Sequence, residues 1–161
     1  MTVSASLEFE VSYGQLAVFV SSLDKPYNDW TAKHVAQGFS WRPHSVSFRT
    51  LAEAGRHAAV VNLDARTGPL HPDTVRAIEV PFDVPEDGAI EIGGIAETIP
   101  FSLPPGRYLL RCEFLATENE SPNRVHLTFA NEESPRFSVV LADAELSDYE
   151  NILRTAEPAS F

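Results

Sequence analysis

The sequence predicts an all-β protein, an antiparallel β-sandwich with one or two short helices. Apolar and polar residues alternate along much of the chain, as they do in strands that bury one face and leave the other in water. Turn-forming residues recur about every 8 to 12 residues, which is typical of sandwiches and barrels. The 161 residues contain no repeat, low-complexity tract or linker. We therefore expect a single domain over residues 1–161, with its core in about residues 7–142.

Alternation of apolar and polar residues predicts strands at four places. They cover residues 7–13, 46–49, 125–129 and 137–141. Residues 58–63 differ, because they are almost wholly apolar and carry the β-branched Val60 and Val61 in the middle. This segment predicts a central strand that is buried on both faces.

Proline and glycine mark two tight turns. In residues 101–108, Pro104 and Pro105 fix φ at about −65°, and Gly106 can adopt the positive φ of a sharp reversal. We therefore expect a β-hairpin here. Its returning strand would have one apolar face, formed by Tyr108, Leu110, Cys112 and Phe114. A similar turn at residues 85–88 separates two further apolar segments.

Two segments indicate short helices. Asn28 or Asp29 can accept hydrogen bonds from the first free amides of a helix that runs to about Gln37 and ends at Gly38. The C-terminal tail, residues 143–161, is expected to be either a short helix that starts near Ser147 or a disordered end.

Composition and charge exclude several classes of protein. The 12 basic and 23 acidic residues give a net charge of −11, which argues against direct binding of nucleic acid, because that affinity comes mainly from Lys and Arg. The same charge favours a basic partner, although a charge of this size can also serve only to keep the protein soluble.

The N-terminus has no signal-peptide pattern, and no apolar stretch reaches the length of about 18 to 20 residues that a membrane span needs. We therefore expect a cytoplasmic protein without membrane insertion.

The sequence contains no recognisable catalytic or metal-binding constellation. The single cysteine, Cys112, excludes a disulfide within the chain and lies on an apolar strand face, which indicates a structural thiol. The five histidines are scattered without the short spacing of metal ligands. No nucleophile elbow, phosphate-binding glycine loop or H-E-x-x-H motif is present. We expect no enzyme, no cofactor and no metal, and the alternative is a hydrolase or metal enzyme of unfamiliar layout.

Paired carboxylates recur in polar loops and at strand ends. The pairs are Glu118 with Glu120, Glu132 with Glu133, and Asp143 with Glu145. We interpret them first as solvated surface, because general acid–base chemistry needs a carboxyl group in an apolar site. If they act on a partner, they would imitate a phosphate backbone for a basic groove. The candidate contact residues of this kind are Glu118, Glu120, Glu132 and Glu133.

Aromatic residues gather around the first predicted helix. They are Tyr27, Trp30, Phe39 and Trp41. They either pin the helix over an open end of the sandwich or form an interface hot spot, in which case Asp29 and Trp30 are candidate partner-binding residues. A carbohydrate-binding module is the alternative function. It would use Trp30 and Trp41 as a platform, with Asn28 and Asp29 as partners for sugar hydroxyls.

The order and spacing of several short segments resemble the competence protein J family. The segments are Ser12-Tyr13 with Gln15, Val18-Phe19, Asp29-Trp30-Thr31, Gly38-Phe39, Ser47-Phe48, Val80-Pro81-Phe82, and Phe101-Ser102-Leu103-Pro104 with Gly106, Tyr108, Leu110 and Cys112. The resemblance runs from about residue 7 to residue 141, and it departs from the family at residues 117–124 and after residue 142. It implies a non-catalytic protein that binds and inhibits a DNA-entry nuclease.

The resemblance assigns no contact residue to the inhibitor role, because the matched positions are mostly structural. The partner it implies is a basic nuclease, in agreement with the acidic charge of the chain. Exposed strand edges would also permit a homodimer by edge pairing or sheet packing, although no residue requires one.

Overall fold

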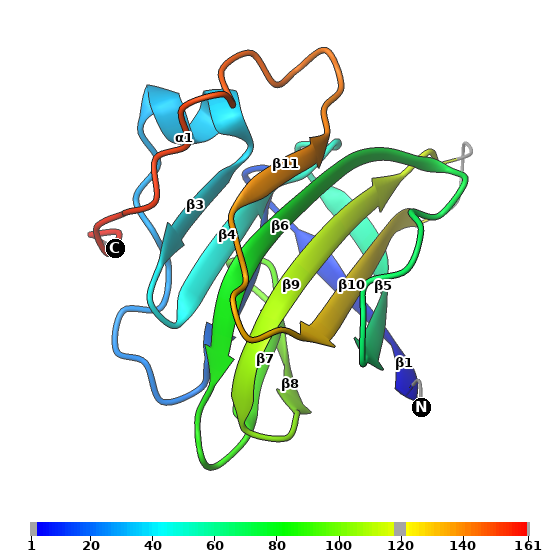
Figure 1. Ribbon diagram of the computed structural model, residues 1–161. Helices are drawn as coiled ribbons and strands as arrows, with labels where there is room; N and C mark the ends of the chain where they lie inside the picture. Colours follow the sequence, from blue (N-terminus) through cyan, green and yellow to red (C-terminus); the bar gives the residue numbers. More distant parts are fainter. Residues whose placement is uncertain (1–2, 118–121, 161) are drawn as a thin grey trace.

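Two β-sheets pack face to face in this protein, as the computed structural model of residues 3–117 and 122–160 shows (Figure 1). The first sheet has the strand order β1 (Val3–Val11), β5 (Gly55–Asp64), β10 (Asn123–Asn131), β9 (Gly106–Leu115), β6 (Thr74–Val84) and β11 (Ser138–Leu141). The second sheet has the order β3 (Phe39–Arg42), β4 (Ser45–Arg49), β2 (Gln15–Val20), β7 (Ala89–Gly93) and β8 (Thr98–Ser102). The predicted all-β fold class is confirmed.

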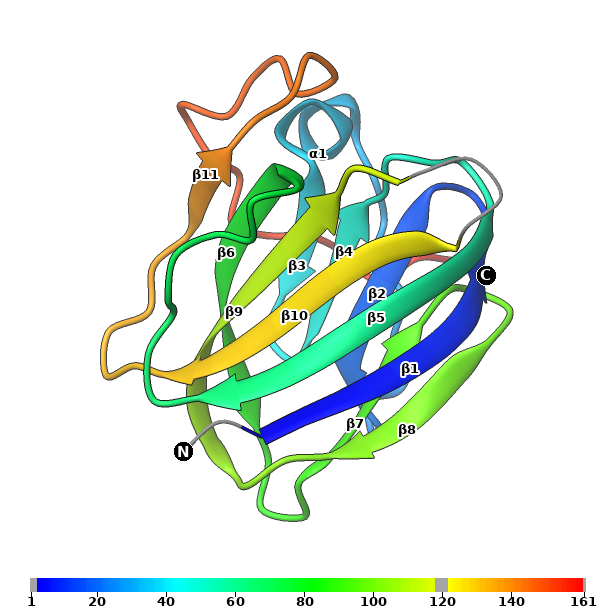
Figure 2. The same ribbon diagram turned by 90° about the vertical axis from the view of Figure 1, so that its right-hand side faces the viewer.

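The strand pairing is antiparallel throughout the described strands except between β5 and β10, which run parallel. Figure 2 shows the first sheet face on, with β5 and β10 side by side at its centre. The predicted strands at 46–49, 125–129 and 137–141 correspond to β4, β10 and β11. The strand predicted at 7–13 is β1, which ends at Val11.

The prediction that residues 58–63 are buried on both faces is wrong. Along β5, His57, Ala59 and Val61 are buried, whereas the residues between them are only partly buried. The reason is the two-layer architecture, because each sheet of a sandwich packs against the other through one face only.

The predicted hairpin at residues 101–108 is also wrong. Strand β8 pairs with β7 in the second sheet, whereas β9 lies between β6 and β10 in the first sheet. Pro104, Pro105 and Gly106 therefore form a corner at which the chain crosses from one sheet to the other. The Tyr108 hydroxyl closes this corner by donating a hydrogen bond to the carbonyl oxygen of Pro104 at 2.7 Å. The turn at residues 85–88 likewise crosses between sheets, from β6 to β7.

The core lies between the inner faces of the two sheets. The predicted apolar face of β9 is confirmed, since its four residues are all buried: Tyr108, Leu110, Cys112 and Phe114. Burial raises the pKa of the Cys112 thiol well above its usual value. The thiol therefore stays protonated and packs as a small apolar group.

The one helix of the described chain, α1 (Ala32–Gln37), begins later than predicted. Its N-cap is Thr31, not Asn28 or Asp29, because the Thr31 hydroxyl accepts from the backbone amide of His34 and the His34 ring accepts from the amide of Thr31. The side-chain amide of Asn28 is used elsewhere, to bridge two neighbouring strands of the second sheet. The predicted end at Gly38 is confirmed, with φ of 93° at that glycine.

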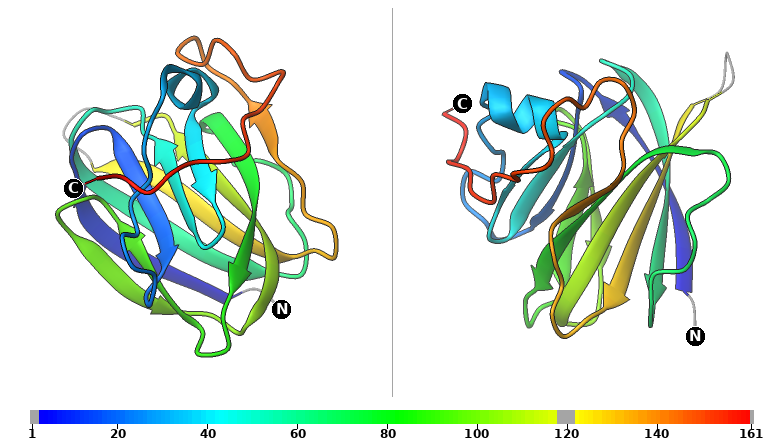
Figure 3. Two further views of the ribbon diagram at one scale, coloured as in Figure 1. Left: turned by 90° about the vertical axis from the view of Figure 1, so that its left-hand side faces the viewer. Right: turned by 45° about the horizontal axis from the view of Figure 1, so that its top comes forward.

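The C-terminal tail forms a strap, residues 143–160, that runs beside α1 and over the outer face of the second sheet (Figure 3). The helix expected near Ser147 is not formed, because the backbone groups of the strap bond to other segments. The amide and carbonyl of Leu153 bond to the Gln37 side chain, and the amide of Asp29 donates to the carbonyl of Glu157. Leu146 of the strap is buried and belongs to the core.

Within residues 3–117 and 122–160, the structure contains no helix with the length and apolar composition of a membrane span.

Candidate functional site

The predicted contact residues that the structure describes lie at different places on the sandwich. Trp30 lines a hollow at the end of the sandwich that carries α1, and Asp29 is exposed next to it in the chain. Glu132 and Glu133 are exposed in the connection from β10 to β11, where they line two other hollows. Glu118 and Glu120 lie outside the described residues. The structure therefore separates the aromatic candidate from the acidic candidates that it describes.

The hollow at Trp30, which we call the α1-end hollow, has a volume of about 410 Å³. Its walls come from the turn between β1 and β2, the loop before α1, α1 itself, the end of β4 with the loop that follows it, and the strap. The aromatic, apolar and charged side chains that line it include Tyr13, Trp30, Val35, Arg49, Glu53 and Glu145. Four separate stretches of the chain, at residues 13–15, 30–35, 49–53 and 145, thus meet at one place.

The turn between β1 and β2 holds Tyr13 out into solvent. Tyr13 and Gly14 both have positive φ, 59° and 64°, which makes this a tight turn of the mirror-image kind. The amide of Gly14 donates to the carbonyl of Glu53, and the carbonyl of Gly14 accepts from the amide of Thr50. Because the amide and the carbonyl of Gly14 both bond to the loop after β4, the backbone sets the position of the neighbouring Tyr13 relative to the hollow.

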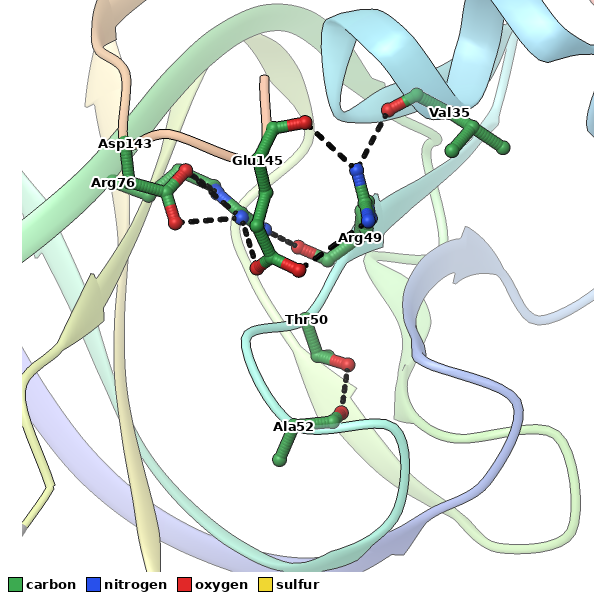
Figure 4. Close-up of polar contacts among 7 residues, drawn as sticks. All are labelled: Val35, Arg49, Thr50, Ala52, Arg76, Asp143 and Glu145. Carbon is green, nitrogen blue, oxygen red and sulfur yellow. Dashed lines mark hydrogen bonds and ion pairs between the residues drawn. The ribbon is translucent and has the colours of Figure 1, made fainter. Parts of the chain in front are cut away.

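A buried arginine forms the polar floor of this end of the sandwich (Figure 4). The Arg76 side chain on β6 is fully buried and donates two hydrogen bonds of 2.9 Å to the Asp143 carboxylate. It also pairs with Glu145 at 2.9 Å and donates to the carbonyl of Arg49. Glu145 is exposed as expected, with 46% of its side chain open to solvent, but neither Asp143 nor Glu145 is merely solvated surface, because both neutralise a charge that burial would otherwise leave unpaired.

Arg49 connects these polar contacts to α1. Its guanidinium donates to the carbonyl oxygens of Val35 and Glu145 and pairs with the Glu145 carboxylate at 3.3 Å. These contacts connect β4, α1 and the strap in one polar network, which Figure 4 shows. The strap is consequently part of the wall of the α1-end hollow.

The two tryptophans occupy different sites. Trp30 packs edge-on against the His34 ring, and its indole nitrogen is buried without a hydrogen-bond partner among the described residues. Trp41 instead packs against Phe137 and donates from its indole nitrogen to the carbonyl of Pro81 at 2.8 Å. Since Trp41 lines a different hollow and the Asn28 amide is committed within the fold, the platform required by the carbohydrate alternative is not formed.

Two histidines that are far apart in sequence share a shallow hollow of about 260 Å³ on the outer face of the first sheet. The rings of His71 and His126 lie 5.0 Å apart, edge to face. Burial is the largest cause that lowers the pKa of His126, and the neighbouring His71 lowers it further. Glu113 accepts from the amide of His71, and the His71 ring accepts from the amide of Asp73. Within the described ranges no three His, Cys, Asp or Glu side chains are grouped so that they could hold a metal ion.

Comparison with known proteins identifies the family of this chain. The family model of competence protein J (ComJ) matches residues 8–132. The DNA-entry nuclease inhibitor of Bacillus subtilis strain 168 is 28% identical over 106 residues, which are 65% of this chain and 77% of that protein.

Two solved structures share the fold. The crystal structure of ComJ, inhibitor of the DNA degrading activity of NucA, from Bacillus subtilis has a TM-score of 0.71 at 22% identity, over 82% of this chain and 99% of that chain. A structure described as crocagin biosynthetic gene J has a TM-score of 0.58 at 14% identity, over 83% of this chain and 99% of that one. The sequence match over most of the chain and the shared sandwich agree: this chain belongs to the competence protein J (ComJ) family.

Proposed function

We propose that this protein is a non-catalytic inhibitor that binds a DNA-entry-type nuclease. The observation that carries the proposal is the family match over residues 8–132, together with the similarity to the DNA-entry nuclease inhibitor of Bacillus subtilis. A fold alone does not carry a function, and the sequence match adds the necessary specificity.

Inhibition by binding agrees with the chemistry of the described residues. The Cys112 thiol is fully buried and protonated, so it is not available as a nucleophile. The paired carboxylates at Asp143 and Glu145 are engaged by Arg76 and hold the strap in place. The α1-end hollow, by contrast, presents exposed aromatic and charged groups of the kind that contact proteins.

The acidic charge of the chain supports a basic partner surface. A net charge of −11 attracts a basic protein over the distance that salt screening permits, about 8 to 10 Å at physiological ionic strength. We therefore expect association to slow and the complex to weaken as the salt concentration rises. A nuclease has a natural reason to carry a basic surface, because it must hold DNA phosphates.

The experiment that tests this function uses the full chain as bait in lysate of the source organism, at low and at high salt, with captured proteins identified by mass spectrometry. The captured nuclease is then purified and its cleavage of plasmid DNA is followed as the chain is added. We expect capture of a nuclease that is lost at high salt, and dose-dependent inhibition. The chain alone on the same DNA is the control and should neither cleave nor retard it. A cognate nuclease that is neither bound nor slowed at micromolar chain would refute the proposal.

A further inference from the structure

We infer that the nuclease docks on the α1-end hollow and that one of its basic side chains enters it, between the ring of Trp30 and the carboxylate of Glu53. The inference rests on the proposed function and names the contact surface that the function would use. Neither the family match nor the predicted acidic loops identify this surface.

The apolar part of the surface is unusually exposed for this chain. Tyr13 is 73% exposed and Val35 is 41% exposed, and both belong to the small set of large apolar side chains that the described structure leaves open to solvent. Both line the same hollow as Trp30. Aromatic side chains at the centre of a contact dominate protein interfaces, and a group of exposed apolar side chains around a hollow marks an interaction site.

The backbone at Tyr13 provides independent support. Tyr13 has φ of 59°, in the left-handed region that disfavours bulky side chains, and burial of its side chain offsets little of this cost because the residue is 73% exposed. Asn or Gly would fit this turn position better, because both tolerate a positive φ. A strained aromatic residue that is mostly exposed contributes little burial to its own fold, which agrees with a role in contact with a partner.

The charge of the hollow selects a basic group. Arg49 pairs with Glu145, and Arg76 pairs with Asp143 and Glu145. In the described part of the chain Glu53 is exposed and makes no ion pair, so its carboxylate is the uncompensated charge of the hollow.

The space beside the Glu53 carboxylate is open to a basic side chain of the partner. A carboxylate oxygen of Glu53 lies over Gly14, 3.4 Å from where a β-carbon would stand, and the missing side chain keeps this part of the hollow open. A Lys or Arg side chain of the partner would pair with Glu53 and lie against the Trp30 ring, which attracts cations through its π face. Exclusion of water at the contact would strengthen both interactions.

The acidic loop after β10 is the competing surface. Glu132 and Glu133 are exposed, and the hollows they line also contain Arg136 and Arg107, so this surface carries charges of both signs; Arg107 itself pairs with Asp83 at 3.2 Å. No exposed aromatic residue accompanies them as Tyr13 accompanies Glu53. Glu132 is therefore the matched control for Glu53, because both are exposed glutamates outside the hydrogen-bonded strands.

The test compares the affinity of the purified nuclease for four forms of the full chain: wild type, Glu53→Lys, Glu132→Lys and Tyr13→Asn. Both lysine variants change the net charge from −11 to −9, since each removes one negative and adds one positive charge. We expect Glu53→Lys and Tyr13→Asn each to raise Kd about tenfold or more, and Glu132→Lys to change it less than about threefold. Thermal unfolding of every variant checks that the fold is intact, and Tyr13→Asn should be at least as stable as wild type.

Each other outcome has a defined meaning. Equal weakening by Glu53→Lys and Glu132→Lys would show that only net charge matters, which overturns the docking site. Wild-type affinity in both Glu53→Lys and Tyr13→Asn would place the contact elsewhere and also overturn it, while leaving the inhibitor function intact. Absence of binding by the wild-type chain would instead refute the function on which the inference rests.

Discussion

Replacing Asp143 by alanine would leave the guanidinium of Arg76 buried with one carboxylate in place of two. Arg76 is fully buried on β6, and Asp143 accepts two hydrogen bonds of 2.9 Å from it. Glu145 would remain at 2.9 Å, but 46% of its side chain is exposed, so it is a weaker partner. The substitution therefore tests how strongly the strap is bound to the sandwich.

The magnitude follows from the contacts that are lost. A hydrogen bond to a charged group contributes about 1.5 to 3 kcal/mol, and breaking a buried ion pair from one side costs about 3 to 5 kcal/mol. The Asp143 side chain is 23% exposed and Glu145 is retained, so we take the lower end, about 3 kcal/mol of unfolding free energy. Arg76→Met should cost less, about 1 kcal/mol, because it leaves no buried charge behind and both carboxylates can reach water.

Urea unfolding followed by tryptophan fluorescence measures this loss. With a slope of about 2 kcal/mol per molar urea, Asp143→Ala should lower the midpoint by about 1.5 M. Asp148→Ala is the matched control from the same strap, because Asp148 is 57% exposed and pairs with Lys33 at the surface. That pair should contribute less than about 1 kcal/mol. The reasoning fails if Asp143→Ala costs no more than the control, or if Arg76→Met costs more than Asp143→Ala.

Three further predictions concern stability. Tyr13→Asn should raise the unfolding free energy by about 1 kcal/mol by relieving the positive φ, and a lower melting temperature would mean that the exposed ring stabilises the fold. Gly88→Ala should lower the unfolding free energy by about 2 kcal/mol or more, because φ is +68° and a β-carbon would lie 2.4 Å from the carbonyl oxygen of Leu103. The control is Gly68→Ala, whose β-carbon would meet nothing within 4 Å. This control should be near neutral in the same urea assay. Burial lowers the pKa of His57 below 6.5, so the unfolded chain binds more protons and stability falls as the pH drops from about 7 through 6.5 towards the folded value. His57→Asn should reduce this fall between pH 7.5 and 5.5, measured as urea midpoints. Equal pH dependence in wild type and His57→Asn would contradict it.

Strand positions and strand faces could be predicted because they depend on neighbouring residues. The alternation along β9 places every second side chain in the core, and this period is visible without knowledge of any other strand. The end of α1 was predictable for the same reason, since a glycine with positive φ terminates a helix locally. The start was not, because Asn28, Asp29 and Thr31 are all good caps and the choice depends on what else each side chain contacts.

The candidate site was only partly visible in the sequence. Trp30 was identified from its residue type, and it does line the α1-end hollow. The alternating pattern places Tyr13 in a strand, although the pair Tyr13-Gly14 at the end of this segment is a signal for an exposed turn. The sequence alone does not connect Asp143 and Glu145 with Arg76, because this arginine lies 67 residues before Asp143 in the chain.

The sequence by itself determined the all-β class, the period of burial along strands such as β9, the single buried cysteine and the acidic charge, because each of these is a property of local pattern or composition. Only the tertiary structure decided that the proline corner joins two sheets, that β5 and β10 pair in parallel, and that the strap returns to α1. It also decided that the turn at Tyr13, the loop after β4 and the strap enclose one hollow. The physical reason is that these features depend on which distant segments bury their apolar faces and satisfy their backbone groups together, and that choice is made by the whole chain at once.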